Sequence, residues 1–248
     1  MAEVHDNAIT VVGGHHAGQL PLYLERGLGD WPFLASLLFA LAFGTVFVGR
    51  PASVTRTAVK TAAVALLLIA CFLTSAPWPL MVGLAFSALG DAFLAVDSER
   101  RLRLGIASFF VAQLSYVLLF CLFATVSKDL GPIEIASVEP TRWIAIGLLL
   151  AVAAAMLAWL WGSLGPMRLP VTLYVAAISA MASSALAMPA YRGPATIGAL
   201  LFFVSDTILA VQLFRGRFRG RAGALAVWWF YYLGQAAIFL GFAGAAAG

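Results

Sequence analysis

Long apolar runs dominate this sequence and restrict what it can fold into. Eight stretches are rich in Ala, Leu, Val and Phe, at roughly 32–49, 57–75, 78–96, 104–126, 142–161, 170–188, 194–213 and 224–245. A helix of about twenty residues crosses the hydrocarbon core of a bilayer, where it satisfies its own backbone polar groups. The runs therefore predict an all-α fold, an integral membrane bundle of eight transmembrane helices.

The scarcity of charged residues supports this interpretation. Charged residues make up 10% of the 248 residues, and hydrophobic residues make up 62%. A soluble domain contains about 25% charged residues, so this chain lacks the charges to cover a surface that faces water. The composition excludes soluble globular, disordered and nucleic-acid-binding proteins, and it makes the lipid bilayer the expected partner.

The joints between the runs are short and contain Gly and Pro, so we expect one transmembrane domain over residues 32–248. Residues 1–31 differ, because they hold all three histidines, His5, His15 and His16, and lack the basic start of a signal peptide. We predict a short extramembrane N-terminal segment there. Adjacent histidines without a third ligand are typical of surface residues, and no metal site is predicted.

The basic residues predict the orientation in the membrane. Eleven lie on the side of the first, third, fifth and seventh joints, and four lie on the other side. By the positive-inside rule, the side with eleven faces the cytoplasm and both termini lie outside. The Ala-rich runs and the excess of Arg over Lys are typical of a bacterium, so a bacterial inner membrane is expected. The eleven residues are Arg50, Arg56, Lys60, Arg100, Arg101, Arg103, Arg168, Arg215, Arg217, Arg219 and Arg221; the four are Arg26, Lys128, Arg142 and Arg192.

Two segments of the chain resemble each other. LAFSALGDAFLAV at 84–96 aligns with ALLFFVSDTILAV at 199–211, and FFVAQ at 109–113 then aligns with YYLGQ at 231–235. The matched segments are four predicted spans apart, so the halves run in the same direction. This pattern predicts two parallel four-helix repeats, related by a pseudo-two-fold axis along the membrane normal. The alternative is that similar Leu-Ala-Val strings recur by chance in apolar helices.

Asp91 and Asp206 are the acidic residues that fall inside the predicted spans. A carboxylate at membrane depth is costly, so it indicates function, and we predict that this pair is catalytic. The repeat would bring the two side chains to similar depth, nearer the basic side. Two carboxylates in a low dielectric repel each other, so one is expected to hold a proton near neutral pH. Ser205 offers Asp206 a hydrogen-bond donor that would keep it ionised, which favours Asp91 as the acid.

Further polar residues lie in the same half of the predicted spans and are candidates for substrate binding. Their three- and four-residue spacings put several on shared helix faces, so they predict one polar pocket that opens toward the cytoplasm. Each type also has a structural explanation: Tyr anchors helices at the interface, Gln joins helices, and Lys extends toward the phosphate layer. The candidates are Lys60, Gln113, Tyr116, Tyr174, Tyr231, Tyr232 and Gln235.

No histidine lies within any predicted span. Histidine-ligated metal sites and nucleophiles activated by histidine are therefore not expected within the membrane. The sequence also lacks a phosphate-binding loop and a dinucleotide fingerprint. We expect no cofactor, and acid–base chemistry by two carboxylates remains as the enzymatic possibility.

The order and spacing of these motifs resemble the YhhN-like lysoplasmalogenase family, a family of multispan membrane hydrolases. The motifs are Lys60, G-D-x-x-L at 90–94, G-x-x-x-F-x-x-A-x-x-x-Y at 105–116, Y-V-A-A-I-S-A-M at 174–181, G-A-x-x-F-x-x-S-D at 198–206 and Y-Y-L-G-Q at 231–235. The chain departs from the family pattern at Gln113, where many members have His, and at Thr61, where Pro is frequent.

The resemblance implies an eight-span enzyme that hydrolyses the vinyl ether bond of lysoplasmalogens without a cofactor. The products would be a fatty aldehyde and glycerophospho-ethanolamine or glycerophospho-choline, and the family's aspartates map onto Asp91 and Asp206. The substrate would then be a lysophospholipid. Two other readings remain open, a small proton-coupled transporter and a lipid-binding membrane protein, each using the same pair. The sequence does not indicate an oligomeric state.

Overall fold

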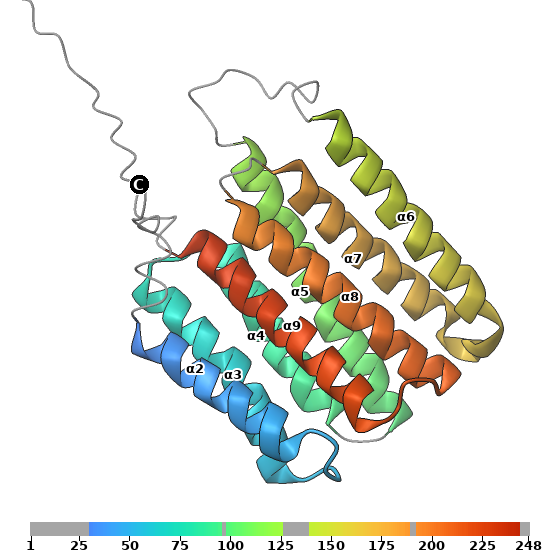
Figure 1. Ribbon diagram of the computed structural model, residues 1–248, viewed down its shortest axis with the longest axis horizontal. Helices are drawn as coiled ribbons and strands as arrows, with labels where there is room; N and C mark the ends of the chain where they lie inside the picture. The colour runs from blue at the N-terminus through green and yellow to red at the C-terminus, as the bar shows by residue number, and fades with distance from the viewer. Residues whose placement is uncertain (1–29, 96–97, 126–138, 189–191, 244–248) are drawn as a thin grey trace, which may run out of the picture.

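The computed structural model describes residues 30–95, 98–125, 139–188 and 192–243, and these residues are all-helical, without a strand. The histidines and the two basic residues Arg26 and Lys128 lie outside this part of the chain. The elements are α2 (Trp31–Ala42), the π-helix η1 (Phe43–Phe47), α3 (Val54–Leu73), α4 (Trp78–Leu94), α5 (Glu99–Thr125), α6 (Pro140–Leu160), the short 3₁₀ helices η4 (Trp161–Ser163) and η5 (Gly165–Met167), α7 (Arg168–Ala187), α8 (Gly193–Arg215) and α9 (Arg221–Phe242) (Figure 1).

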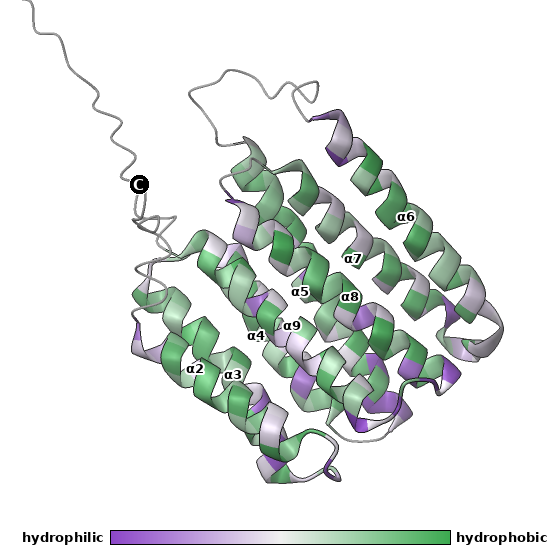
Figure 2. Ribbon diagram, viewed as in Figure 1, coloured by the Kyte–Doolittle hydropathy of each residue, from purple (hydrophilic) through white to green (hydrophobic). Residues whose placement is uncertain are grey.

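Each predicted apolar run corresponds to one α-helix, although the helices differ in length. Within the described ranges, six helices are long and apolar enough to cross a membrane, namely α3 and α5–α9. The other two, Trp31–Phe47 and Trp78–Leu94, are apolar but shorter, so the prediction of long spans is confirmed for six of the eight runs. Apolar residues cover the helices along most of their length, and hydrophilic residues gather toward the ends (Figure 2).

Local sequence signals explain where several helices begin and end. Proline occupies the first turn of α2, α4, α6 and α8, where the missing N–H costs no helical hydrogen bond. Ser53 caps α3, because its side chain accepts a hydrogen bond of 3.1 Å from the backbone N–H of Arg56. Gly216 ends α8 in the left-handed conformation, with φ of +66°, which favours glycine.

The bundle is built on two closely packed helix pairs, α4 with α5 and α8 with α9. In α8 and α9 the backbones approach at two glycines: a Cβ added to Gly198 would lie 2.6 Å from the carbonyl oxygen of Gly234. In α4, Gly83 and Gly90 leave room for the rings of Tyr116 and Phe109 on α5. Small residues at such contacts let helices pack through dispersion, which drives association in lipid.

Helix α6 stands at the edge of the bundle, beside α7 (Figure 1). Its buried residues are Leu149, Ala153 and Leu160, and most of its other side chains are exposed. The main core lies instead among α2–α5 and α7–α9, where the rings of Phe43, Trp228, Phe202 and other aromatic residues are buried. The α6 helix therefore forms an outer wall of the bundle.

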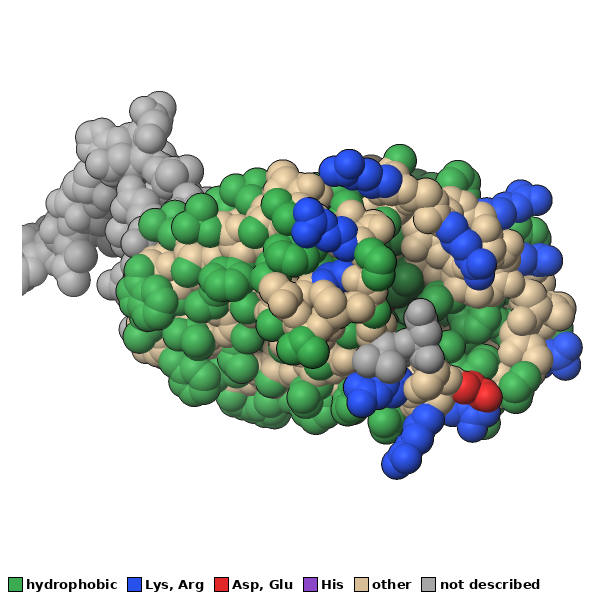
Figure 3. All heavy atoms as spheres, turned by 90° about the horizontal axis from the view of Figure 1, so that it is seen from below, with side chains coloured by type: hydrophobic (Ala, Val, Ile, Leu, Met, Phe, Trp, Pro, Cys, Tyr) green, Lys and Arg blue, Asp and Glu red, His purple; other side chains and the backbone are tan. Residues whose placement is uncertain are grey.

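Four joints lie at one end of the bundle: α2–α3, α4–α5, α6–α7 and α8–α9 (Figure 1). We call this the basic end, because all eleven basic residues assigned to the cytoplasmic side by the sequence belong to these joints or to the adjoining helix ends. Seen from this end, Lys and Arg side chains surround a hollow in the surface (Figure 3). Arg142 and Arg192 belong to the opposite end.

Candidate active site

A cavity of about 280 Å³ lies inside the basic half of the bundle. Residues from η1 and from every helix α3 to α9 line it, and both predicted catalytic residues, Asp91 and Asp206, are among them. Lys60, Tyr174 and Tyr231 line it as well. We call it the central cavity. It brings together side chains from both halves of the chain.

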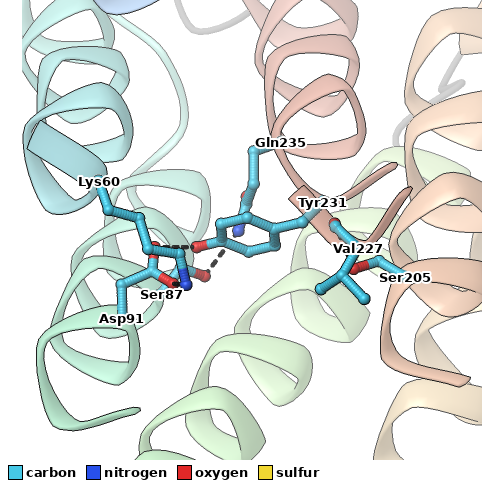
Figure 4. A network of polar contacts seen from close by, with 7 residues as sticks. All are labelled: Lys60, Ser87, Asp91, Ser205, Val227, Tyr231 and Gln235. Carbon is cyan, nitrogen blue, oxygen red and sulfur yellow. Dashed lines mark hydrogen bonds and ion pairs between the residues drawn. The ribbon is translucent and has the colours of Figure 1, made fainter. Parts of the chain in front are cut away.

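Asp91 lies near the end of α4 and is held by two partners (Figure 4). Its Oδ1 forms an ion pair of 2.7 Å with Lys60 Nζ, and its Oδ2 accepts a hydrogen bond of 2.8 Å from the Tyr231 hydroxyl. Asp91 is 1% exposed, so an unpaired charge there would be strongly unfavourable. Lys60 also lies 5.7 Å from the centre of the Tyr231 ring. The three side chains from α3, α4 and α9 therefore form one charge-compensated cluster.

A second set of hydrogen bonds supports this cluster from behind. The Tyr116 hydroxyl donates to Gln235 Oε1 at 2.5 Å, and Gln235 Nε2 donates to Ser87 Oγ at 2.8 Å. Ser87 and Gln235 lie one helical turn from Asp91 and Tyr231, on the same faces of α4 and α9. Tyr116, Ser87 and Gln235 are fully buried and do not line the cavity. Their hydrogen bonds therefore orient the cluster and do not contact a ligand. Ser87 was not among the residues predicted from the sequence, although it lies four residues before Asp91 and therefore on the same helix face.

Asp206 on α8 has different surroundings. Its Oδ2 accepts a hydrogen bond from the Tyr174 hydroxyl on α7, and Gln113 Nε2 on α5 donates to that hydroxyl at 3.5 Å. Asp206 is partly buried, and it lies within electrostatic range of Asp91 and Lys60. Among the residues that the structure describes, no Lys or Arg forms an ion pair with it. The charge of Asp91 is thus compensated by Lys60, whereas Asp206 accepts a hydrogen bond from a neutral tyrosine hydroxyl.

Ser205 does not stabilise the Asp206 carboxylate, so that expectation is wrong. Its hydroxyl donates to the carbonyl oxygen of Val227 at 2.9 Å and ties α8 to α9 (Figure 4). A hydroxyl has one proton to donate, and this contact uses it. The reason for favouring Asp91 as the acid is therefore removed.

Tyr232 lies on another face of α9. Its hydroxyl is 2.9 Å from Ser36 Oγ, and Ser36 donates its own proton to the carbonyl oxygen of Ala63 at 2.5 Å. Tyr232 is therefore the donor in its contact with Ser36. This pair joins α9 to α2 and α3 away from the central cavity. Tyr232 is absent from the cavity lining, as are Gln113, Tyr116 and Gln235.

The central cavity has one polar side and one apolar side. On the polar side, Arg56 lies over the Phe43 ring at 5.4 Å, near Lys60. On the other side, aliphatic and aromatic side chains from α5, α6, α7 and α8 line the wall. They are Leu102, Ile106, Ala153, Met156, Leu157, Leu160, Val171, Val175, Ile178, Ala210 and Phe214. The two carboxylates lie in the same cavity as this apolar wall, which suits an amphipathic molecule.

The arrangement supports acid–base chemistry on such a molecule. One carboxylate is compensated by a cation and the other is not, so they differ in how readily each takes up a proton. In the part of the chain that the structure describes, no three His, Cys, Asp or Glu side chains come together as metal ligands. Reactive side chains that line the cavity include the two carboxylates, Tyr174, Tyr231 and Lys60.

Comparison with known proteins identifies the family. Lysoplasmalogenases of Mycobacterium bovis (strain ATCC BAA-935 / AF2122/97) and Mycobacterium tuberculosis (strain CDC 1551 / Oshkosh) are each 28% identical to this chain over 168 residues. That region covers 66% of this chain and 59% of each relative, so the match spans less than two thirds of their length. No solved structure matches the chain. The sequence pattern of the YhhN family matches residues 55–242, which include α4 to α9 and both aspartates, and the chain therefore belongs to the YhhN family.

Proposed function

We propose that this membrane protein is a hydrolase that cleaves the vinyl ether bond of lysoplasmalogens. The products are a fatty aldehyde and glycerophospho-ethanolamine or glycerophospho-choline. Family membership and the two relatives named lysoplasmalogenase support this proposal. The observation that carries it is the shared cavity, where Asp91 and Asp206 have unlike partners and face an apolar wall.

A parallel repeat would account for the presence of both carboxylates in one cavity. Asp91 on α4 is bound by Lys60 from the helix before it, and Asp206 on α8 is bound by Tyr174 from the helix before it. Tyr231 and Phe109, which the repeat aligns, contact each other edge to face at 5.8 Å. These matched contacts support two four-helix halves around a pseudo-two-fold axis. In this proposal all eight helices cross a bacterial inner membrane, both termini lie outside, and the basic end faces the cytoplasm.

The reaction begins with a proton transfer to carbon. A vinyl ether is protonated at its β-carbon, and the electron pair of the double bond forms the new C–H bond, which leaves an oxocarbenium ion. Asp206 is the donor in this proposal, because no Lys or Arg among the described residues forms an ion pair that would hold it ionised. Asp91 remains a carboxylate beside Lys60 and Tyr231, and its negative charge stabilises the developing cation. The roles are therefore the reverse of those expected from the sequence, where Ser205 was thought to keep Asp206 ionised and Asp91 was favoured as the acid.

The second half of the reaction returns the proton. Water adds to the α-carbon of the oxocarbenium ion, and the Asp206 carboxylate accepts the proton that the water loses. The resulting hemiacetal then breaks its C–O bond to the glycerol, the hydroxyl proton moves to the glycerol oxygen, and the aldehyde forms. One water is consumed and Asp206 ends protonated, as it began. The roles parallel those of the carboxyl pair in glycosidases, which also pass through an oxocarbenium-like state.

The apolar wall suits the alkenyl chain of the substrate. The side chains from α5, α6, α7 and α8 remove that chain from water, and each buried methylene group contributes about 0.8 kcal/mol. The glycerol and headgroup then lie on the polar side, near Arg56 and the basic end. The vinyl ether bond lies between these two parts of the molecule, where the carboxylates are.

The test is aldehyde release from a lysoplasmenyl-ethanolamine by the purified protein. Asp206→Asn removes the proton donor and Asp91→Asn removes the stabilising negative charge, and both keep the size of the side chain. We therefore expect kcat to fall by about 10²–10⁴-fold in each variant. Glu99→Gln is the matched control, because Glu99 is an exposed acid at the same end of the bundle. Near-normal turnover in either Asn variant would refute the paired-carboxylate mechanism. Movement of the lipid across the bilayer of proteoliposomes, with no release of aldehyde, would favour a transporter instead.

A further inference from the structure

A second polar pocket lies at the basic end, beside the central cavity. It has a volume of about 540 Å³ and lies between the joint α2–α3 and the joint α8–α9. Three arginines converge on it from these two joints: Arg50, Arg219 and Arg221. We call it the arginine pocket. Its lining is completed by Thr45, Val46, Val48, Gly49, Gly220 and Ala224.

Each arginine is anchored by a protein contact and keeps donors for a ligand. Arg221 Nη2 donates to the carbonyl oxygen of Thr45 at 3.3 Å, and Arg219 Nε donates to that of Gln212 at 3.1 Å. The Arg50 guanidinium lies 5.5 Å from the centre of the Phe47 ring. A guanidinium carries five N–H donors, so these contacts leave most of them available.

Among the residues that the structure describes, no acidic side chain compensates the charge of the arginine pocket. No described Asp or Glu lines the pocket, and none of them forms an ion pair with its three arginines. Three like charges around one hollow repel each other, and a bound anion relieves that repulsion. The planar guanidinium fork matches the oxygens of a phosphate in particular.

The arginine pocket adjoins the reaction site. Val48 and Ala224 line both the arginine pocket and the central cavity, so the two spaces share a wall. Lys60, which lines the central cavity, is already paired with Asp91. The three arginines next door are therefore better suited to hold a headgroup anion than Lys60 is.

We propose that the arginine pocket binds the phosphate of the lysophospholipid substrate while its vinyl ether bond lies between Asp91 and Asp206. This inference rests on the proposed function and adds a phosphate-binding site to it: through these arginines the enzyme selects lipids with a phosphate over neutral alkenyl lipids. Because the arginines contact the phosphate, this pocket does not by itself separate ethanolamine from choline headgroups.

The experiment compares two substrates that differ only in the phosphate-containing headgroup. One is a lysoplasmenyl-ethanolamine and the other is the corresponding 1-alkenyl glycerol. The measured quantity is the ratio of kcat/KM for the first to kcat/KM for the second. Arg50→Gln and Arg221→Gln should each lower this ratio about tenfold, as expected for the loss of a hydrogen bond to a charged group, and the double variant should lower it further.

The control variant is Arg101→Gln. Arg101 is an exposed arginine at the same end of the bundle, and it lines neither pocket. Arg101→Gln removes the same charge from the basic end. If a general loss of surface potential caused the effect, this control would lower the kcat/KM ratio as much as Arg50→Gln or Arg221→Gln does. A general folding defect would lower both kcat/KM values and leave their ratio unchanged. A wild-type ratio in the Arg50→Gln, Arg221→Gln double variant would overturn the inference.

A binding measurement separates this inference from the proposed function. The probe is a 1-alkyl lysophospholipid, whose saturated ether has no vinyl bond to protonate, titrated into the detergent-solubilised protein by calorimetry. Binding that weakens about tenfold in Arg221→Gln supports the phosphate site even if the wild-type protein releases no aldehyde. Equal binding by wild type and the double variant overturns the site even if aldehyde is released. The activity comparison can also be made in anionic bilayers. If the arginine variants lose activity only there, and equally for lysoplasmenyl-ethanolamine and the 1-alkenyl glycerol, the pocket binds a bilayer lipid and the inference is overturned.

Discussion

The Lys60–Asp91 ion pair makes a quantitative prediction about stability. Lys60→Met keeps a long unbranched side chain and removes the charge, which leaves the Asp91 carboxylate buried beside Tyr231 alone. Removing one partner of a buried ion pair costs about 3–5 kcal/mol. Because Lys60 is 24% exposed and Asp91 is 1% exposed, we take the lower end, about 3 kcal/mol. For a chain of this length, that corresponds to a fall in Tm of about 6–12 °C.

The assay is thermal unfolding in detergent, followed by tryptophan fluorescence. The decisive comparison is with the double variant Lys60→Met, Asp91→Asn, which removes the buried charge as well as its partner. The double variant should recover most of the lost Tm, because the uncompensated charge, and not the missing contact, causes the loss. Arg103→Met is the control, since it breaks an exposed pair of 2.5 Å with Glu99 and should lower Tm by less than about 2 °C.

Two outcomes would refute this reasoning. A Lys60→Met variant within 2 °C of wild type would mean that Asp91 is not an ionised, compensated carboxylate. A double variant no more stable than Lys60→Met would mean that packing of the Lys60 side chain, and not charge compensation, stabilises this region. Either result would also remove the basis for assigning Asp91 as the ionised member of the catalytic pair.

Further predictions concern the hydroxyl of Tyr231 and the packing of α4. Tyr231→Phe keeps the ring contacts with Phe109 and Phe202 and removes the hydrogen bond to Asp91, so aldehyde release should slow about tenfold or more; an unchanged kcat would exclude that hydroxyl from catalysis. Gly83→Ala would bring a Cβ within 2.3 Å of the Tyr116 ring, so Tm should fall by an amount equal to about 1–3 kcal/mol. Gly147→Ala on α6 has open space around the added Cβ and should show no such fall in the same melt.

The orientation of the side chains on α9 could not be predicted from the sequence. Tyr231 and Tyr232 are neighbours in the chain and were equivalent candidates, since both lie about one turn from Gln235. In the structure, Tyr231 contacts Asp91 and Tyr232 contacts Ser36. Successive residues point about 100° apart around a helix. Which of them meets the cavity therefore depends on how α9 is rotated against α3 and α4, and distant residues set that rotation.

The all-helical fold and the two acidic residues that line the cavity could be predicted from the amino-acid sequence alone. Runs of apolar residues fold as helices in lipid because the backbone has no other hydrogen-bond partner there, and a carboxylate within such a run needs a partner or a function. Three contacts could not be predicted in this way: the ion pair of Lys60 with Asp91, the hydrogen bond of Ser205 to Val227, and the convergence of three arginines from two joints on one pocket. These contacts join helices far apart in the chain, so helix packing creates them and no local pattern records them.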